Sequence, residues 1–96
     1  MRQRQATSES TFRLMQNYPN PFNPRTIIQY SITEDGFVTL KVFDPLGKEV
    51  ATLVNEEKKS GDYIAKWEAT RFPTGVYFCQ LKAGHFVQMI KLLLLK

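Results

Sequence analysis

The sequence predicts an all-β fold, an antiparallel β-sandwich of about seven strands. Polar and apolar residues alternate along most of the chain, which is the pattern of strands with one buried face. Turn-forming residues separate the alternating runs, and no segment fits a helix of useful length. Because 96 residues provide for one hydrophobic core, we expect a single domain.

The predicted domain covers residues 12–96 and begins with a strand over Phe12–Gln16. Residues 1–11 are polar and predict a disordered linker or a remnant of an expression vector. They contain no apolar run of the kind that forms a signal peptide. The closing segment Met89–Lys96 is too short and too charged to cross a bilayer, so no direct membrane span is predicted.

A proline-rich segment follows the first strand, and we call residues Asn17–Pro24 the proline arm. It holds three prolines and three asparagines in eight residues. Each proline fixes its φ angle and lacks an N–H, and each residue before a proline is restricted to extended geometry. We therefore predict a stiff, polyproline-like lid without a hydrogen-bond ladder, with Tyr18 and Phe22 available for burial. The residues of this structural motif are Pro19, Asn20, Pro21, Phe22, Asn23 and Pro24.

The next strands follow from period-two alternation. Runs over Ile28–Ile32 and Val38–Val42 place their apolar residues on one face, and Glu34–Gly36 separates them as a hairpin turn. Asp44–Gly47 has Asp, Pro and Gly at the positions that a type I turn prefers. The run Gly47–Val54 is less regular, which predicts a bulge or an edge strand.

The last three strands are predicted over Tyr63–Glu68, Tyr77–Lys82 and Phe86–Leu94, with a tight turn at Ala83–His85. Glu56–Gly61 is expected to be a longer polar connection before them. Short strands at this spacing favour an immunoglobulin-like sandwich over a barrel. Its core anchor is the only tryptophan, Trp67.

No pattern in the chain indicates catalysis, so no catalytic residue, cofactor or metal is predicted. The single cysteine, Cys79, excludes an internal disulfide and is expected to be a small buried hydrophobe. The single histidine, His85, is expected to be exposed in a turn. Asp35, Asp44 and Asp62 lie in or beside turns, where capping of backbone N–H groups is favoured over a calcium site.

The net charge of +4 is unevenly distributed, because residues 69–96 contain Arg71, Lys82, Lys91 and Lys96 but no acid. Four dispersed bases do not predict nucleic-acid binding. The run Leu92–Leu95 breaks the alternation, so leucines project from both faces of the last strand. Either the strand closes the sandwich, or it presents an apolar edge to a partner. That edge also favours dimerisation by edge pairing or swapping.

Several blocks, in order along the chain, resemble one family. They are Gln16–Pro24, Thr26–Tyr30, Val42–Val50, Gly61–Trp67, Pro73–Phe78 and Lys91–Lys96. These blocks resemble the type A C-terminal sorting domains of type IX secretion cargo, the Por secretion tail family. Cys79 and Gln80 depart from the pattern, since an aromatic residue and a base are more usual at these positions.

The resemblance implies an immunoglobulin-like domain at the tail of a larger exported protein. Its partners are then the type IX translocon and shuttle proteins, which read the domain in the periplasm and deliver the cargo through the outer membrane. A sortase-like surface protease usually cuts upstream, here within Ala6–Thr11, and the cargo is released or joined to an anionic lipopolysaccharide. Met1 and the missing signal peptide lead us to expect that the chain is a fragment.

The family's closing strands are held to carry the sorting signal. The recognition residues so implied are Gly75, Val76, Tyr77, Gly84, Lys91, Leu92, Leu93, Leu94, Leu95 and Lys96. Two alternative functions are an accessory immunoglobulin-like domain of the flagellar hook-capping type and a carbohydrate-binding module. The first shares the Gly75-Val76-Tyr77 hairpin, and the second requires Phe37, Phe43 and Phe78 to line up on a solvent face.

Overall fold

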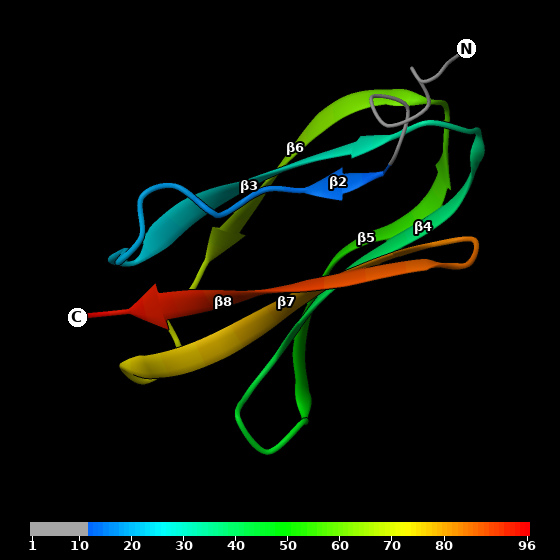
Figure 1. The fold of residues 1–96 in the computed structure, drawn as a ribbon. Coiled ribbons are helices and arrows are strands. Elements are labelled where there is room, and N and C mark those ends of the chain that lie inside the picture. The colour runs from blue at the N-terminus through cyan, green and yellow to red at the C-terminus, as the bar shows by residue number, and fades with distance from the viewer. Residues whose placement is uncertain (1–11) are drawn as a thin grey trace, which may run out of the picture.

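The computed structural model describes residues 12–96 as two antiparallel sheets packed against each other (Figure 1). A three-stranded sheet has the order β2-β3-β6 and a four-stranded sheet the order β5-β4-β7-β8. The strands are β2 (Arg13–Leu14), β3 (Arg25–Ile32), β4 (Gly36–Phe43), β5 (Glu49–Lys58), β6 (Gly61–Glu68), β7 (Gly75–Ala83) and β8 (Phe86–Leu94). The predicted immunoglobulin-like sandwich of seven strands is confirmed.

Within residues 12–96 there is no helix, and therefore none that could cross a membrane. The linker predicted over residues 1–11 and the cleavage stretch Ala6–Thr11 lie outside the described residues.

The core lies between the sheets and is centred on Trp67, as predicted. The Trp67 ring centroid lies 5.6 Å from that of Phe22, 5.6 Å from that of Phe72 and 5.4 Å from that of Tyr77. β3, β4 and β7 contribute alternate residues to this core, for example Leu40 in β4, whereas β5 contributes only Val54 as a buried residue. Aromatic pairs at these separations add to the stability that apolar burial provides.

The strand β5 confirms one prediction and contradicts another. It is an edge strand, and its register with β4 shifts twice, so it has both predicted irregularities. It also continues to Lys58, which pairs with Gly36, so the polar connection predicted over Glu56–Gly61 is wrong. Lys58 supports the extension, because its ammonium lies 3.0 Å from the Glu56 carboxylate and 4.6 Å from the centre of the Tyr63 ring.

The first strand is shorter than predicted, since β2 holds only Arg13 and Leu14 of the expected Phe12–Gln16. The side chain of Gln16 instead donates a hydrogen bond to the backbone carbonyl of Lys91, 2.7 Å away on β8. The chain stays beside β3 after β2, because Met15 and Tyr18 still form backbone hydrogen bonds with Gln29 and Ile27.

Turn aspartates hold the connections between strands. The Asp44 Oδ1 atom accepts the backbone N–H groups of Leu46 and Lys48, each at 2.9 Å. Gly47 completes that turn with a φ of +86°, a value that glycine adopts without strain. The Oδ1 atom of Asp35 accepts from the backbone of Ser60 at 2.8 Å. These contacts are the capping role that the sequence favoured for turn aspartates.

Candidate recognition surface

The predicted recognition residues gather on the closing hairpin, in which β7 and β8 pair from Gly75–Leu94 to Ala83–Phe86. Gly84 and His85 form its two-residue turn, and Gly84 has a φ of +60°. A glycine with positive φ at the first turn position matches the twist of paired strands. His85 is exposed there, as predicted.

Three of these residues belong to the core and not to the surface. Leu92 and Leu94 are fully buried, and Tyr77 is buried with its hydroxyl donating to the carbonyl of Pro73 at 2.6 Å. Burial is the reason that the Tyr77 pKa is raised. In the folded domain these side chains can support a recognition surface but cannot themselves touch a partner.

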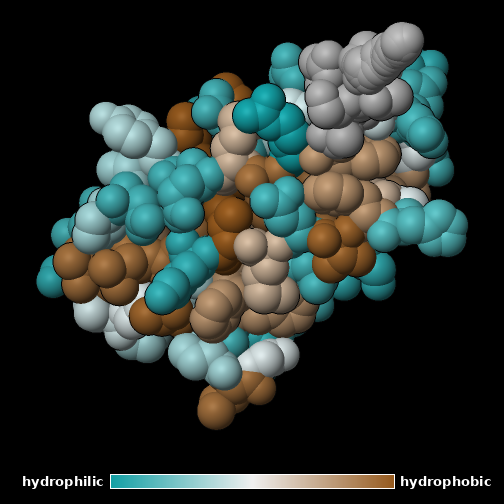
Figure 2. Space-filling view, viewed as in Figure 1, coloured by the Kyte–Doolittle hydropathy of each residue, from teal (hydrophilic) through white to brown (hydrophobic). Residues whose placement is uncertain are grey.

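The opposite side of the hairpin faces solvent and is apolar and basic. We call it the outer hairpin face, made of Val76, Phe78, Gln80, Lys82, Val87, Met89, Lys91 and Leu93. These residues form four cross-strand pairs, including Val76 with Leu93 and Phe78 with Lys91. Phe43 of β4 extends the surface, because it pairs with Phe78. Figure 2 shows apolar side chains interspersed with hydrophilic ones on the side of the molecule that carries β8.

The bases of this face are not neutralised locally. Within residues 12–96 neither Lys82 nor Lys91 has a carboxylate within 4.0 Å. Lys96 differs, because its ammonium donates to the carbonyl of Thr70 and its backbone N–H donates to the Thr74 hydroxyl at 3.0 Å. The terminal lysine therefore folds back onto the turn before β7, whereas Lys82 and Lys91 point to solvent.

The proline arm covers the outer edge of β8. Phe22 is buried, donates its N–H to the carbonyl of Leu93 at 3.0 Å, and accepts the N–H of Leu95 at 3.0 Å. The Oδ1 atom of Asn20 accepts the N–H of Leu93 at 3.1 Å. The arm is therefore a lid, as predicted, but the prediction that it lacks ladder hydrogen bonds is wrong. A strand from another protein could pair with Leu93–Leu95 only if the proline arm moved away from this edge.

The rest of the arm packs onto β3. The buried amide of Asn17 donates to the Thr26 hydroxyl at 2.9 Å and to the carbonyl of Pro19 at 3.0 Å. Tyr18 bridges Ile27 through two backbone hydrogen bonds. Its side chain is nevertheless 73% exposed, so the expectation that Tyr18 is buried is wrong.

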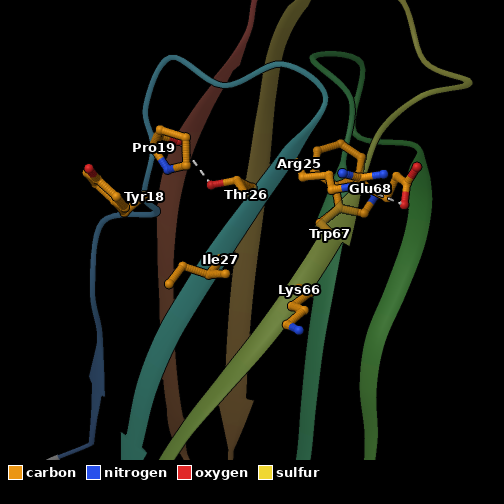
Figure 3. A pocket seen from close by; sticks show the side chains of 8 residues that line it. All are labelled: Tyr18, Pro19, Arg25, Thr26, Ile27, Lys66, Trp67 and Glu68. Atoms are coloured by element: carbon orange, nitrogen blue, oxygen red, sulfur yellow. Dashed lines mark hydrogen bonds and ion pairs between the residues drawn. The ribbon is translucent and has the colours of Figure 1, made fainter.

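A hollow of about 440 Å³ lies where the arm meets β3 and β6 (Figure 3). At its margin the guanidinium of Arg25 lies 3.4 Å from the carboxylate of Glu68. A hydrogen bond from Thr70, and then this ion pair, lower the pKa of Glu68. Among residues 12–96, no histidine or cysteine lines the hollow, and the one carboxylate that does is exposed and already paired. The arrangement has neither a nucleophile with its base nor a pair of carboxylates.

Cys79, the only cysteine of the chain, is on β7, which lies between β4 and β8 in its sheet, and it is fully buried, as predicted. Burial raises the pKa of Cys79 to about 12. We therefore expect native protein at pH 8 to resist labelling by a thiol-specific disulfide reagent, while protein in strong denaturant is labelled quickly. Following the absorbance of the released thiolate measures both rates. Equal rates with and without denaturant would show that Cys79 is accessible in the native fold.

The sequence prediction included Val76, Lys91 and Leu93 of the outer hairpin face but missed its other residues. Lys82, Val87 and Met89 were not among the predicted recognition residues, yet they share a face with Lys91. Once Leu92 and Leu94 are known to be buried, the alternation of a strand places the odd-numbered residues of β8 on the outward face. The supporting polar pair Asn17 and Thr26 was also missed, because their contact depends on how the arm folds.

Fold and surface define a class of protein, a small β-sandwich with an exposed apolar and basic hairpin face and with no assembled catalytic centre among residues 12–96. The family model for secretion system C-terminal sorting domains matches residues 16–95. The chain therefore belongs to the type IX secretion C-terminal sorting domains, the Por secretion tail family. A search of curated proteins found no match. Members of this family are sorting signals that accompany exported proteins and are non-catalytic in general.

Proposed function

We propose that this domain is a non-catalytic signal that directs a larger cargo protein across the outer membrane by type IX secretion, and that its closing hairpin is what the machinery reads. Family membership over residues 16–95 carries the proposal. We propose the outer hairpin face as the part of the hairpin that is read, because burial of Tyr77, Leu92 and Leu94 leaves those side chains out of reach of a partner. The partners are then the translocon and its shuttle proteins.

The chemistry of the outer hairpin face indicates what kind of partner surface would bind it. An apolar strip formed by Val76, Phe78 and Leu93 lies beside Lys91, and Lys82 lies further along the same face, opposite Val87. Within residues 12–96 neither lysine has a carboxylate within 4.0 Å. A complementary partner offers an apolar patch with carboxylates at its rim. Charged rims chiefly increase the association rate, and salt weakens their effect.

The experiment is a fusion of residues 12–96 to a periplasmically exported reporter in a host with a type IX system. We expect the reporter to reach the cell surface or the medium. A reporter that stays in the periplasm while the domain is folded would count against the proposal.

Charge reversal tests the outer hairpin face directly. We expect Lys82→Glu with Lys91→Glu to reduce delivery about tenfold or more, because two attractive contacts at the partner's rim become repulsive. The variant should keep its fold, since both side chains are exposed. The matched control is Lys48→Glu, which changes an exposed lysine in the turn between β4 and β5. If the double variant were delivered as well as the wild type, the outer hairpin face would not be the surface that the machinery reads.

After delivery, we propose that a sortase-like surface protease cuts upstream of residue 12 and that the cargo is released or joined to an anionic lipopolysaccharide. The support is the family's usual processing and the polar stretch Ala6–Thr11. In a second fusion that carries residues 1–96, sequencing the C-terminus of the delivered reporter gives the cleavage position. Mature reporter that retains the whole domain would argue against removal.

The two alternative functions gain no comparable support. A hook-capping accessory domain would assemble at a filament tip, and no feature of residues 12–96 favours that assembly. A carbohydrate-binding module needs a platform of exposed aromatic rings, but Phe43 and Phe78 are half-buried and only Phe37 is largely exposed. Binding to a glycan array would revive that reading.

A further inference from the structure

The outer edge of β6 is unpaired among the described residues. The strand lies at the margin of the three-stranded sheet and pairs only with β3 (Figure 1). The N–H of Ala69 donates to the carbonyl of Pro24. In an antiparallel pair every second residue of a strand bonds the same neighbour, so this bond shows which residues of β6 face β3. By that alternation the odd-numbered residues of β6 bond β3. The N–H and C=O groups of Asp62, Ile64 and Lys66 therefore point outward.

The other sheet edges are less available. On β8 the proline arm holds Leu93 and Leu95, and the side-chain oxygen of Gln88 accepts the N–H of Leu14 at 3.2 Å. The edge strand β5 is bulged at two places, which disfavours regular pairing with another strand. β6 is regular over its whole length, because its register with β3 does not shift.

The outward side chains of β6 are complementary to themselves. Asp62, Ile64 and Lys66 lie on one face of the strand, and Ile64 is 59% exposed. The carboxylate of Asp62 accepts the Ser31 hydroxyl at 2.6 Å, and Lys66 has no carboxylate within 4.0 Å among residues 12–96. An acid and a base placed symmetrically about an exposed apolar residue can pair with the same segment running in the opposite direction.

We propose that β6 pairs antiparallel with β6 of a second copy of this chain, about a two-fold axis at Ile64. In this register Ile64 faces Ile64 of the second copy, and each Asp62 faces a Lys66. The two three-stranded sheets become one continuous sheet of six strands. Self-association is thereby placed at β6 and not at the closing strand, and it does not depend on the proposed sorting function.

This register is favoured because shifting the two-fold axis along β6 either brings like charges together or leaves the charges without a partner. Moving the axis toward the C-terminus by one residue sets Asp62 opposite Glu68 at both ends. Moving it one residue further sets Lys66 opposite Lys66. Moving it toward the N-terminus by one residue leaves both charges without an opposite partner, since Asp62 then faces Ile64. Only the axis at Ile64 gives two opposite-charge pairs and one apolar pair.

The experiment measures the mass of the full chain by sedimentation equilibrium over a range of protein concentrations. We expect a monomer–dimer equilibrium. Lys66→Asp alone should weaken dimerisation about tenfold or more, because two carboxylates then face each other at both ends of the paired strands. Asp62→Lys alone should do the same, with two ammonium groups in opposition. The double variant D62K/K66D should restore the dimer.

A mixture gives the decisive result. The two single variants, each monomeric alone, should form a heterodimer when combined, because every acid then faces a base. The control is Lys82→Asp on β7, which should leave dimerisation unchanged, and circular dichroism verifies that each variant is folded. A wild-type chain that is monomeric at all concentrations overturns the inference. So does a dimer that Lys66→Asp leaves intact, which would place the contact elsewhere.

Discussion

Replacing Phe22 with alanine is expected to lower the free energy of unfolding by about 3–5 kcal/mol. Phe22 is buried against Trp67, with ring centroids 5.6 Å apart, so truncation leaves a cavity beside the core anchor. Unfolding in urea can be followed by fluorescence, because Trp67 is the only tryptophan. A domain of this size is stable by about 5–15 kcal/mol, so the substitution removes a large fraction of its stability.

The matched control lies four residues earlier in the same arm. Tyr18 is 73% exposed, and Tyr18→Ala should change the free energy of unfolding by less than about 0.5 kcal/mol. If Phe22→Ala were as mild as the control, the arm would not be part of the core.

Removing residues 92–96 is expected to unfold the domain and abolish delivery of an attached reporter. Leu92 and Leu94 are fully buried, and each contributes about 1.5–3 kcal/mol through burial alone. The deletion also takes away the backbone groups of Leu93 and Leu95 that bond Phe22. Circular dichroism and limited proteolysis should report a largely unfolded domain, while a separate reporter domain stays folded.

The control for the deletion is Leu95→Ser, which keeps the backbone and changes a side chain that is 47% exposed. It should leave the domain folded. Because the deletion removes both fold and signal, its failure in delivery cannot separate recognition from folding. The variants of Lys82 and Lys91 make that separation, since they alter the surface of a folded domain. A deleted chain that still reached the surface would refute the role of the hairpin.

The fold was predictable from the sequence because its causes are local. Alternation in Ile28–Ile32 and Val38–Val42 reports burial of one face, and the Asp44–Gly47 turn follows from the preferences of three residues. The end of β5 was not predictable in the same way. Glu56, Glu57 and Lys58 have the composition of a loop, and they form a strand because β4 continues beside them.

The proposed recognition surface was half predictable. The sequence identified the closing hairpin, but a leucine run has no polar residues to mark which side is buried. Packing against Trp67 and Phe22 decides that Leu92 and Leu94 face inward. The contacts between the arm and β8 join residues about 70 positions apart, and contacts over such a distance produce no periodic pattern in a sequence.

The bond between Phe22 and Leu93–Leu95 ties an early segment of the domain to a late one. During synthesis, the arm cannot complete its hydrogen bonds with β8 until Leu93 and Leu95 have left the ribosome. Native contacts that join such distant parts of a chain form slowly, so closure is expected to be a late step. A polypeptide that lacks residues 92–96 therefore has no partner for the arm, so synthesis of these residues is expected to precede formation of the proposed recognition face.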